Sequence, residues 1–204
     1  MKVGRTLMKL KKAFILLVIS TVILAGCNSN KFQAETDWEV EPFSHESQRG
    51  EEVSLESLKG TVWLSAFIFT NCDDVCPPMT MNLTMVQDEL IKLGVEDYKI
   101  VEFSVDPEVD TPEVLAEYLA KFNAPDESKW ELLTGYAPTY IEQFARNSFK
   151  ATVKADPGSD QVIHGVSFYL VDQNGIVVKN YNGYTDVPTE EIATDMQALI
   201  EQGK

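Results

Sequence analysis

The chain has 204 residues, 44% of them hydrophobic, which is enough for one domain with a substantial apolar core. A formal net charge of −15 argues against nucleic acid or an anionic lipid surface as a binding partner. A domain of this size does not need a disulfide to fold, which weakens a purely structural role for a cysteine pair among the three cysteines.

The first 26 residues are predicted to be an export signal. Residues 1–12 carry five basic and no acidic side chains, and residues 13–26 form an apolar run that is short for a membrane-spanning helix. The end of this run, LAGC at 24–27, resembles the lipobox of a bacterial lipoprotein. By that resemblance, cleavage before Cys27 leaves this cysteine lipid-modified; an uncleaved N-terminal anchor is the alternative. Either outcome places the protein outside the cytoplasm, tethered to the cell membrane.

The mature chain is expected to be a short polar tether, residues 27–37, followed by a single domain, residues 38–204. Loss of the five basic residues takes the formal charge from −15 to −20. No linker, repeat or low-complexity segment interrupts the chain after Trp38. Excess negative charge keeps a tethered domain soluble, which is sufficient to explain it.

The domain alternates strand and helix patterns. Residues 61–69 are a continuous apolar run, typical of a strand buried on both faces, and apolar residues from Val75 to Leu90 then recur at helical spacing. Thr111 and Pro112 are typical of a helix N-cap and first position. The other elements are strands at 98–105 and 130–135, a helix at 137–149, a hairpin at 167–183 and a helix at 188–202. This order predicts an α/β domain with a thioredoxin-like fold, a central mixed sheet and a C-terminal hairpin plus helix.

Cys72 and Cys76 follow the first buried strand and lie at the start of the next helix. Helix N-termini stabilise thiolates, whereas the neighbouring Asp73 and Asp74 raise a thiol pKa and suit a cation. Residues four apart on a helix have Cβ atoms about 5–6 Å apart, whereas a disulfide needs about 3.5–4.5 Å. Cys72 must therefore precede the helix if the pair is to oxidise. A redox couple, a reactive nucleophile and a metal clamp all remain open.

The chain has two histidines that could complete a metal site. His45 lies in a polar, turn-rich stretch and is predicted to be a solvated surface residue. His164 lies just before the hairpin. Redox proteins of this fold place a cis-proline at that point, opposite the cysteines. This chain has no proline between Pro157 and Pro188, so His164 is expected to face the cysteine pair instead. Two thiolates and an imidazole are soft ligands that suit copper, and thiolates suit Cu(I) in particular.

Four segments, 69–79, 103–119, 130–135 and 161–175, together resemble the Sco/SenC family of copper-binding, membrane-anchored assembly proteins. The resemblance implies a thioredoxin-like fold and a role in loading copper into the dinuclear copper A site of cytochrome c oxidase. By the same resemblance, Cys72 and Cys76 match the two cysteine ligands of the family and His164 matches the histidine ligand.

Two further features of the resemblance concern acidic residues. Asp106 and Asp110 match family motif positions and are expected to organise their loop rather than to carry chemistry. The family histidine is commonly preceded by aspartate, whereas Ile163 precedes it here, so any carboxylate that orients the imidazole must come from elsewhere, such as Asp160.

Two functions follow as expectations. In the first, Cys72, Cys76 and His164 hold Cu(I) or Cu(II) and deliver it to the copper-A-bearing subunit of cytochrome c oxidase, making the protein more a metallochaperone than an enzyme. In the second, the protein is a thiol–disulfide oxidoreductase that keeps that subunit's cysteines reduced, with Cys72 attacking and Cys76 resolving. A copper donor or a thiol reductant would be an additional partner. A peroxidase is disfavoured, because Arg49 and Arg146 are the only arginines in the predicted mature chain that could activate a peroxidatic thiolate.

Overall fold

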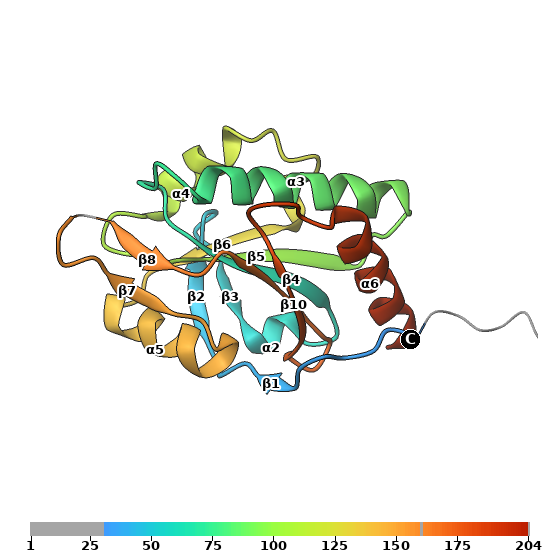
Figure 1. The fold of residues 1–204 in the computed structure, drawn as a ribbon. Helices are drawn as coiled ribbons and strands as arrows, with labels where there is room; N and C mark the ends of the chain where they lie inside the picture. The colour runs from blue at the N-terminus through green and yellow to red at the C-terminus, as the bar shows by residue number, and fades with distance from the viewer. Residues whose placement is uncertain (1–30, 160, 204) are drawn as a thin grey trace, which may run out of the picture. The chain divides into compact units, whose positions relative to one another are not determined.

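A computed structural model describes residues 31–159 and 161–203, which form an α/β domain (Figure 1). Three parallel strands, β4, β5 and β6, lie in the middle of an eight-stranded mixed sheet, and antiparallel strands flank them on both sides. In sheet order the strands are β1 (Trp38–Glu39), β10 (Ile176–Asn182), β9 (Ser167–Val171), β4 (Val62–Ile68), β5 (Tyr98–Ser104), β6 (Trp130–Thr134), β2 (Ser44–Ser47) and β3 (Glu52–Ser54). The predicted α/β class and mixed sheet are confirmed.

Helices cover both faces of the sheet. The helices are α2 (Leu55–Leu58), α3 (Cys76–Lys92), α4 (Pro112–Ala120), α5 (Pro138–Phe149) and α6 (Thr189–Gln202), with a 3-10 turn, η2, at Glu127–Lys129. Helices α3 and α6 pack against each other on one face, and α5 lies on the other (Figure 1). On the α5 side, Phe67 and Phe103 of the sheet contact Phe149 of the helix in an aromatic core. Burial on both faces explains why β4 and β5 are so apolar.

The predicted elements are present with bounds shifted by one or two residues, and several short elements were not predicted. Among these are β1, β2, β3 and α2 before the first central strand, and a separate two-stranded sheet of β7 (Val153–Ala155) and β8 (Val162–His164). Strands of two to four residues carry too few side chains to show a hydrophobic period.

The prediction for His45 was wrong. This residue lies in β2, and its ring is half-buried against Tyr136 and Tyr140, at centroid distances of 4.6 and 4.8 Å. Both tyrosines lie about 90 residues further along the chain. The local sequence around His45 is polar and suggests a surface turn, because contacts with residues so far along the chain cannot be inferred from it.

Contacts with the domain begin before Trp38, the predicted start. Phe32 packs against the core, and the backbone N–H of Glu35 donates to the Val178 carbonyl at 2.7 Å. The predicted export signal and Cys27 lie outside the described residues. Within the described part of the chain, no helix has the length and apolar character needed to cross a membrane.

Candidate metal centre

The loop between β4 and α3 positions Cys72, and the first residue of α3 is Cys76. Pro77 and Pro78 have no N–H, so Cys76 supplies the only backbone donor among the first three positions of the helix. This N–H donates to the Cys72 sulfur at 3.4 Å, and no other side chain caps the helix. The sulfur therefore takes the place of an N-cap acceptor. The prediction that Cys72 precedes the helix is confirmed.

Asp110 ties this loop to the sheet. Its buried carboxylate accepts hydrogen bonds from the Thr70 hydroxyl at 2.5 Å, from the Thr70 N–H at 3.2 Å and from the Ser104 hydroxyl at 2.6 Å. The Asp106 N–H in turn donates to the Ser104 oxygen at 3.1 Å. The contacts with Ser104 lie within the loop of Asp106 and Asp110, as predicted, and the contacts with Thr70 extend the role of Asp110 to the chain two residues before Cys72.

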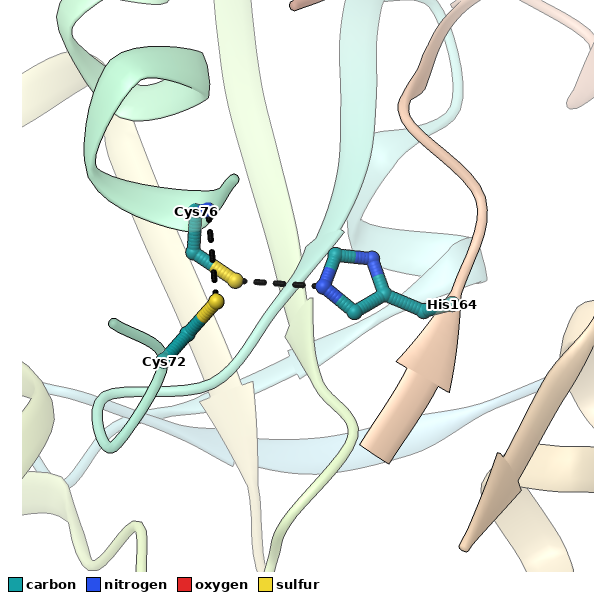
Figure 2. Close-up of side chains that lie close together, drawn as sticks. All are labelled: Cys72, Cys76 and His164. Carbon is teal, nitrogen blue, oxygen red and sulfur yellow. Dashed lines mark hydrogen bonds between the residues drawn. The ribbon is translucent and has the colours of Figure 1, made fainter. Parts of the chain in front are cut away.

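His164 reaches the cysteines from the second, smaller sheet. It is the last residue of β8, paired with Val153 of β7, and its ring points toward the cysteine pair (Figure 2). Its Nε2 lies 3.1 Å from the Cys76 sulfur, and its Nδ1 lies 2.9 Å from the Gly165 carbonyl oxygen. A carbonyl can only accept, so Nδ1 carries a proton, and Nε2 is the ring nitrogen that faces the sulfurs and is placed to bind a metal.

The orienting partner of the imidazole is therefore a backbone carbonyl. Asp160, proposed for this role, lies outside the described residues. The Phe69 ring packs edge-on against the imidazole, at a centroid distance of 5.7 Å, and further restricts its orientation. Both contacts hold Nε2 toward the sulfurs.

The three candidate ligands are brought together as predicted. One ligand atom from each of Cys72, Cys76 and His164 lies within 4.8 Å of the other two. Metal–sulfur bonds of about 2.3 Å and metal–nitrogen bonds of about 2.0–2.1 Å separate ligand atoms by about 3.5–4 Å, so a small contraction would close the group around one ion. Two sulfurs and one imidazole nitrogen form a soft donor set that fits copper.

The two thiols differ in their affinity for protons. Cys76 is 0% exposed and donates its S–H to Cys72, which is 8% exposed. This hydrogen bond, with weaker ones from the backbone N–H groups of Cys76 and Asp74, lowers the pKa of Cys72 well below its ordinary value. The same bond and burial raise the pKa of Cys76. A thiolate in the pair is therefore favoured at Cys72, and the thiol at Cys76.

The effect predicted for the two aspartates beside Cys72 is not the dominant one. Asp73 and Asp74 are exposed, and the pKa of Cys72 moves downward because hydrogen bonds to its sulfur outweigh burial. One of those hydrogen bonds comes from the backbone of Asp74 itself. The backbone donors of the loop decide the direction.

Sequence reasoning missed one buried acid close to this site, Glu102 in the middle of β5. Its side chain is 0% exposed, and the Thr80 hydroxyl of α3 donates to Oε1 at 3.3 Å. A glutamate inside an otherwise apolar buried strand was the available signal.

Comparison with known proteins gives consistent matches. The SCO1/SenC family model matches residues 32–201. The SCO1 protein homolog of Bacillus subtilis (strain 168) is 46% identical over 177 residues, covering 87% of this chain and 91% of that protein. BsSco is a member of the Sco family of cytochrome c oxidase assembly proteins in which a disulfide switch was identified. Its structure has a TM-score of 0.74 at 47% identity and covers 85% of this chain and 99% of that one.

The structure of Bradyrhizobium japonicum ScoI with copper bound has a TM-score of 0.67 at 31% identity, covering 79% of this chain and 99% of that one. These neighbours confirm the thioredoxin-like fold. A relative of the same fold has thus been solved with copper, and this chain has a Cys-Cys-His group that could hold copper.

Proposed function

The chain belongs to the SCO1/SenC family, and on that premise we propose that it binds copper through Cys72, Cys76 and His164 and delivers it during assembly of the copper A site of cytochrome c oxidase. The observation that carries the proposal is the convergence of two sulfurs and one nitrogen of an oriented imidazole within 4.8 Å. The copper-bound ScoI relative supports it.

Copper titration of the full chain tests the ligand assignment. His164→Ala should weaken Cu(II) binding by more than about 100-fold, since loss of an outer-shell partner alone costs about 10–100-fold. His45→Phe is the matched control, because it removes the other imidazole and leaves the site intact. Equal Cu(II) affinity in wild type and His164→Ala would remove the histidine from the site and overturn the clamp.

The asymmetry of the two thiols supports a second candidate function, thiol–disulfide oxidoreductase. Cys72 is the more exposed sulfur and carries the thiolate, as an attacking thiol requires, whereas Cys76 is buried and protonated, as suits a resolving thiol. The disulfide switch identified in BsSco is in line with such chemistry. The substrate would be the oxidised cysteine pair of the copper-A-bearing subunit.

A copper-free assay separates the two functions. The reduced chain is mixed with a purified, oxidised copper-A-bearing subunit, and free thiols on that subunit are counted. Catalytic turnover with a thiol reductant, lost in Cys72→Ser, would favour the oxidoreductase. Transfer of one copper per chain, with no thiol exchange before metal addition, would favour delivery.

We also propose that the domain acts at the outer surface of the cell membrane, attached through a lipid on Cys27. The LAGC segment at 24–27 supports this location. Mass spectrometry of the membrane-extracted protein should find Cys27 as a lipid-modified N-terminus. An intact N-terminus at Met1 would favour the uncleaved anchor.

A further inference from the structure

Glu102 is a fully buried carboxyl group with no cationic partner among the described residues. Oε1 accepts one hydrogen bond, from Thr80, and Oε2 has no partner. The other buried acids are satisfied: Asp110 accepts three hydrogen bonds, and Glu131 pairs with Arg49 and Lys99. An unpaired buried acid is destabilising, because burial penalises its charge.

The carboxyl group lies beside the cysteine pair. Thr80 follows Cys76 by one turn on the buried face of α3, and both residues are 0% exposed. From α4, the Tyr118 hydroxyl lies 2.8 Å from that of Thr80. Next to Glu102 in the sheet are the apolar residues Ala66 and Leu132.

The titratable groups that face Glu102 are therefore Cys76 and Tyr118. Charge on Glu102 raises the pKa of both, although burial and hydrogen bonding have larger effects on each group. Burial raises the pKa of Glu102 itself to about 8. At neutral pH the group is mostly uncharged, and a negative charge forms beneath the first turn of α3 in mildly alkaline solution.

We propose that Glu102 is a positioning residue that sets the electron affinity of the Cys72/Cys76 pair, favouring the reduced pair as a neutral acid and the disulfide as a carboxylate. Reduction of the disulfide by a dithiol adds two electrons and one proton to the pair and yields one thiolate and one thiol, while the dithiol becomes a disulfide. The reduced site carries one more negative charge than the oxidised site. A carboxylate nearby therefore disfavours reduction.

The same sign holds for copper, and this extension rests on the proposed function. The Cu(I) form of a dithiolate–imidazole site carries one more negative charge than the Cu(II) form. An ionised Glu102 should therefore favour Cu(II), and the neutral acid should favour Cu(I).

Glu102→Gln tests the proposal in the copper-free full chain. The variant keeps an acceptor for Thr80 and cannot ionise. Each protein is equilibrated with reduced and oxidised dithiothreitol from pH 6 to 9.5, and the Cys72–Cys76 peptide is quantified by differential alkylation and mass spectrometry. The equilibrium constant for oxidation of the Cys72/Cys76 pair by oxidised dithiothreitol is compared between the two proteins. The ratio of the wild-type constant to the Glu102→Gln constant should not change with pH below pH 7. It should rise about tenfold by pH 9, equivalent to about 30 mV for this two-electron couple.

Two further variants make the result specific to Glu102. Thr80→Val removes the hydrogen bond that lowers the pKa of Glu102, so its rise in oxidation constant should move to higher pH. Glu131→Gln, at a buried acid that is already paired, should follow the wild-type curve. Circular dichroism of each variant confirms that the folded protein is measured.

A wild-type to Glu102→Gln ratio that stays flat to pH 9.5 in folded protein would overturn the proposal. The thiol measurement uses no metal, so its outcome does not depend on copper binding. In a parallel series, ascorbate reduction of the copper-loaded chain should fall with pH in wild type and not in Glu102→Gln. If neither wild type nor Glu102→Gln binds copper, only the proposed function is refuted. If both bind copper and its reduction has the same pH profile in both, only the extension to copper is refuted.

Discussion

Replacement of Glu102 by glutamine should change how the stability of the domain depends on pH. In the folded state burial raises the pKa of Glu102 to about 8, against an ordinary value of 4.5. Between these values the folded chain binds a proton that the unfolded chain releases. Stability from this group is therefore complete below pH 4.5 and is lost as pH rises toward 8.

The structure sets the size of this loss. Each pH unit in that interval removes about 1.4 kcal/mol, so about 3 kcal/mol is lost between pH 4.5 and pH 7. Glutamine cannot ionise, so the variant escapes this loss. Burial of an amide adds a separate term of about 1–3 kcal/mol that is independent of pH. The quantity to measure is therefore the difference in free energy of unfolding between wild type and Glu102→Gln, followed as a function of pH. The constant term from the buried amide does not affect how this difference changes with pH.

Urea unfolding of wild type and Glu102→Gln, followed by circular dichroism at half-unit steps from pH 4.5 to 8, measures this quantity. The difference in free energy of unfolding should move by about 3 kcal/mol in favour of the variant by pH 7. Glu131→Gln is the matched control, because it removes ion pairs with Arg49 and Lys99 and should destabilise the domain at neutral pH. A difference between wild type and Glu102→Gln that stays constant with pH would show that the carboxyl group titrates normally and would refute the reasoning.

Three other changes should have measurable effects. Asp110→Ala leaves the Thr70 hydroxyl, the Thr70 N–H and the Ser104 hydroxyl without their acceptor, and water can reach the two groups of part-exposed Thr70. The free energy of unfolding in urea should therefore fall by about 2–4 kcal/mol. The control Asp74→Ala, at an exposed residue, should lower it by less than about 0.5 kcal/mol, and equal effects would contradict the anchoring role. Burial lowers the pKa of His45, so the neutral imidazole stabilises the fold above the ordinary pKa of 6.5 and this stabilisation is lost as pH falls below it. Between pH 7.5 and 5, the melting temperature of His45→Phe should therefore drop less than that of wild type. Equal drops in the two proteins would argue against a buried, neutral His45. Iodoacetamide at pH 6 should modify Cys72 before Cys76, as read by peptide mass spectrometry. Cys76→Ala should move the alkylation profile of Cys72 to higher pH, because alanine has no donor and the largest cause of the low Cys72 pKa is lost; an unchanged profile would exclude the sulfur–sulfur hydrogen bond.

Features that depend on neighbours in the chain could be predicted from the sequence. The apolar run at 61–69 predicted a buried strand, and the apolar residues at helical spacing from Val75 to Leu90 predicted the helix that follows it. Together they place Cys72 in a loop and Cys76 at a helix N-terminus. The role of Thr111 as N-cap of α4, where its hydroxyl accepts from the Val114 N–H, followed in the same way.

The place of the third candidate ligand was partly predictable. The position of His164 before the hairpin suggested that it faces the cysteines, because the fold class brings that loop to the active helix. The strand pairing with β7 that holds it there, and the Gly165 carbonyl that fixes its tautomer, were not foreseeable. A three-residue strand has no detectable period, and a backbone carbonyl leaves no signature in sequence.

By itself, the sequence determined the order of the elements and the places of Cys72 before a helix and Cys76 at its start, and it indicated the kind of metal that two thiolates suit, since these rest on local period and ligand chemistry. Only the tertiary structure decided that the thiol of Cys76 has the higher pKa and that His45 packs against two tyrosines. It also decided that buried Glu102 contacts α3 and has no cationic partner among the described residues. The physical reason is the same in each case. Proton affinity depends on burial and on donors within a few ångströms, and those donors come from strands and helices far apart in the chain.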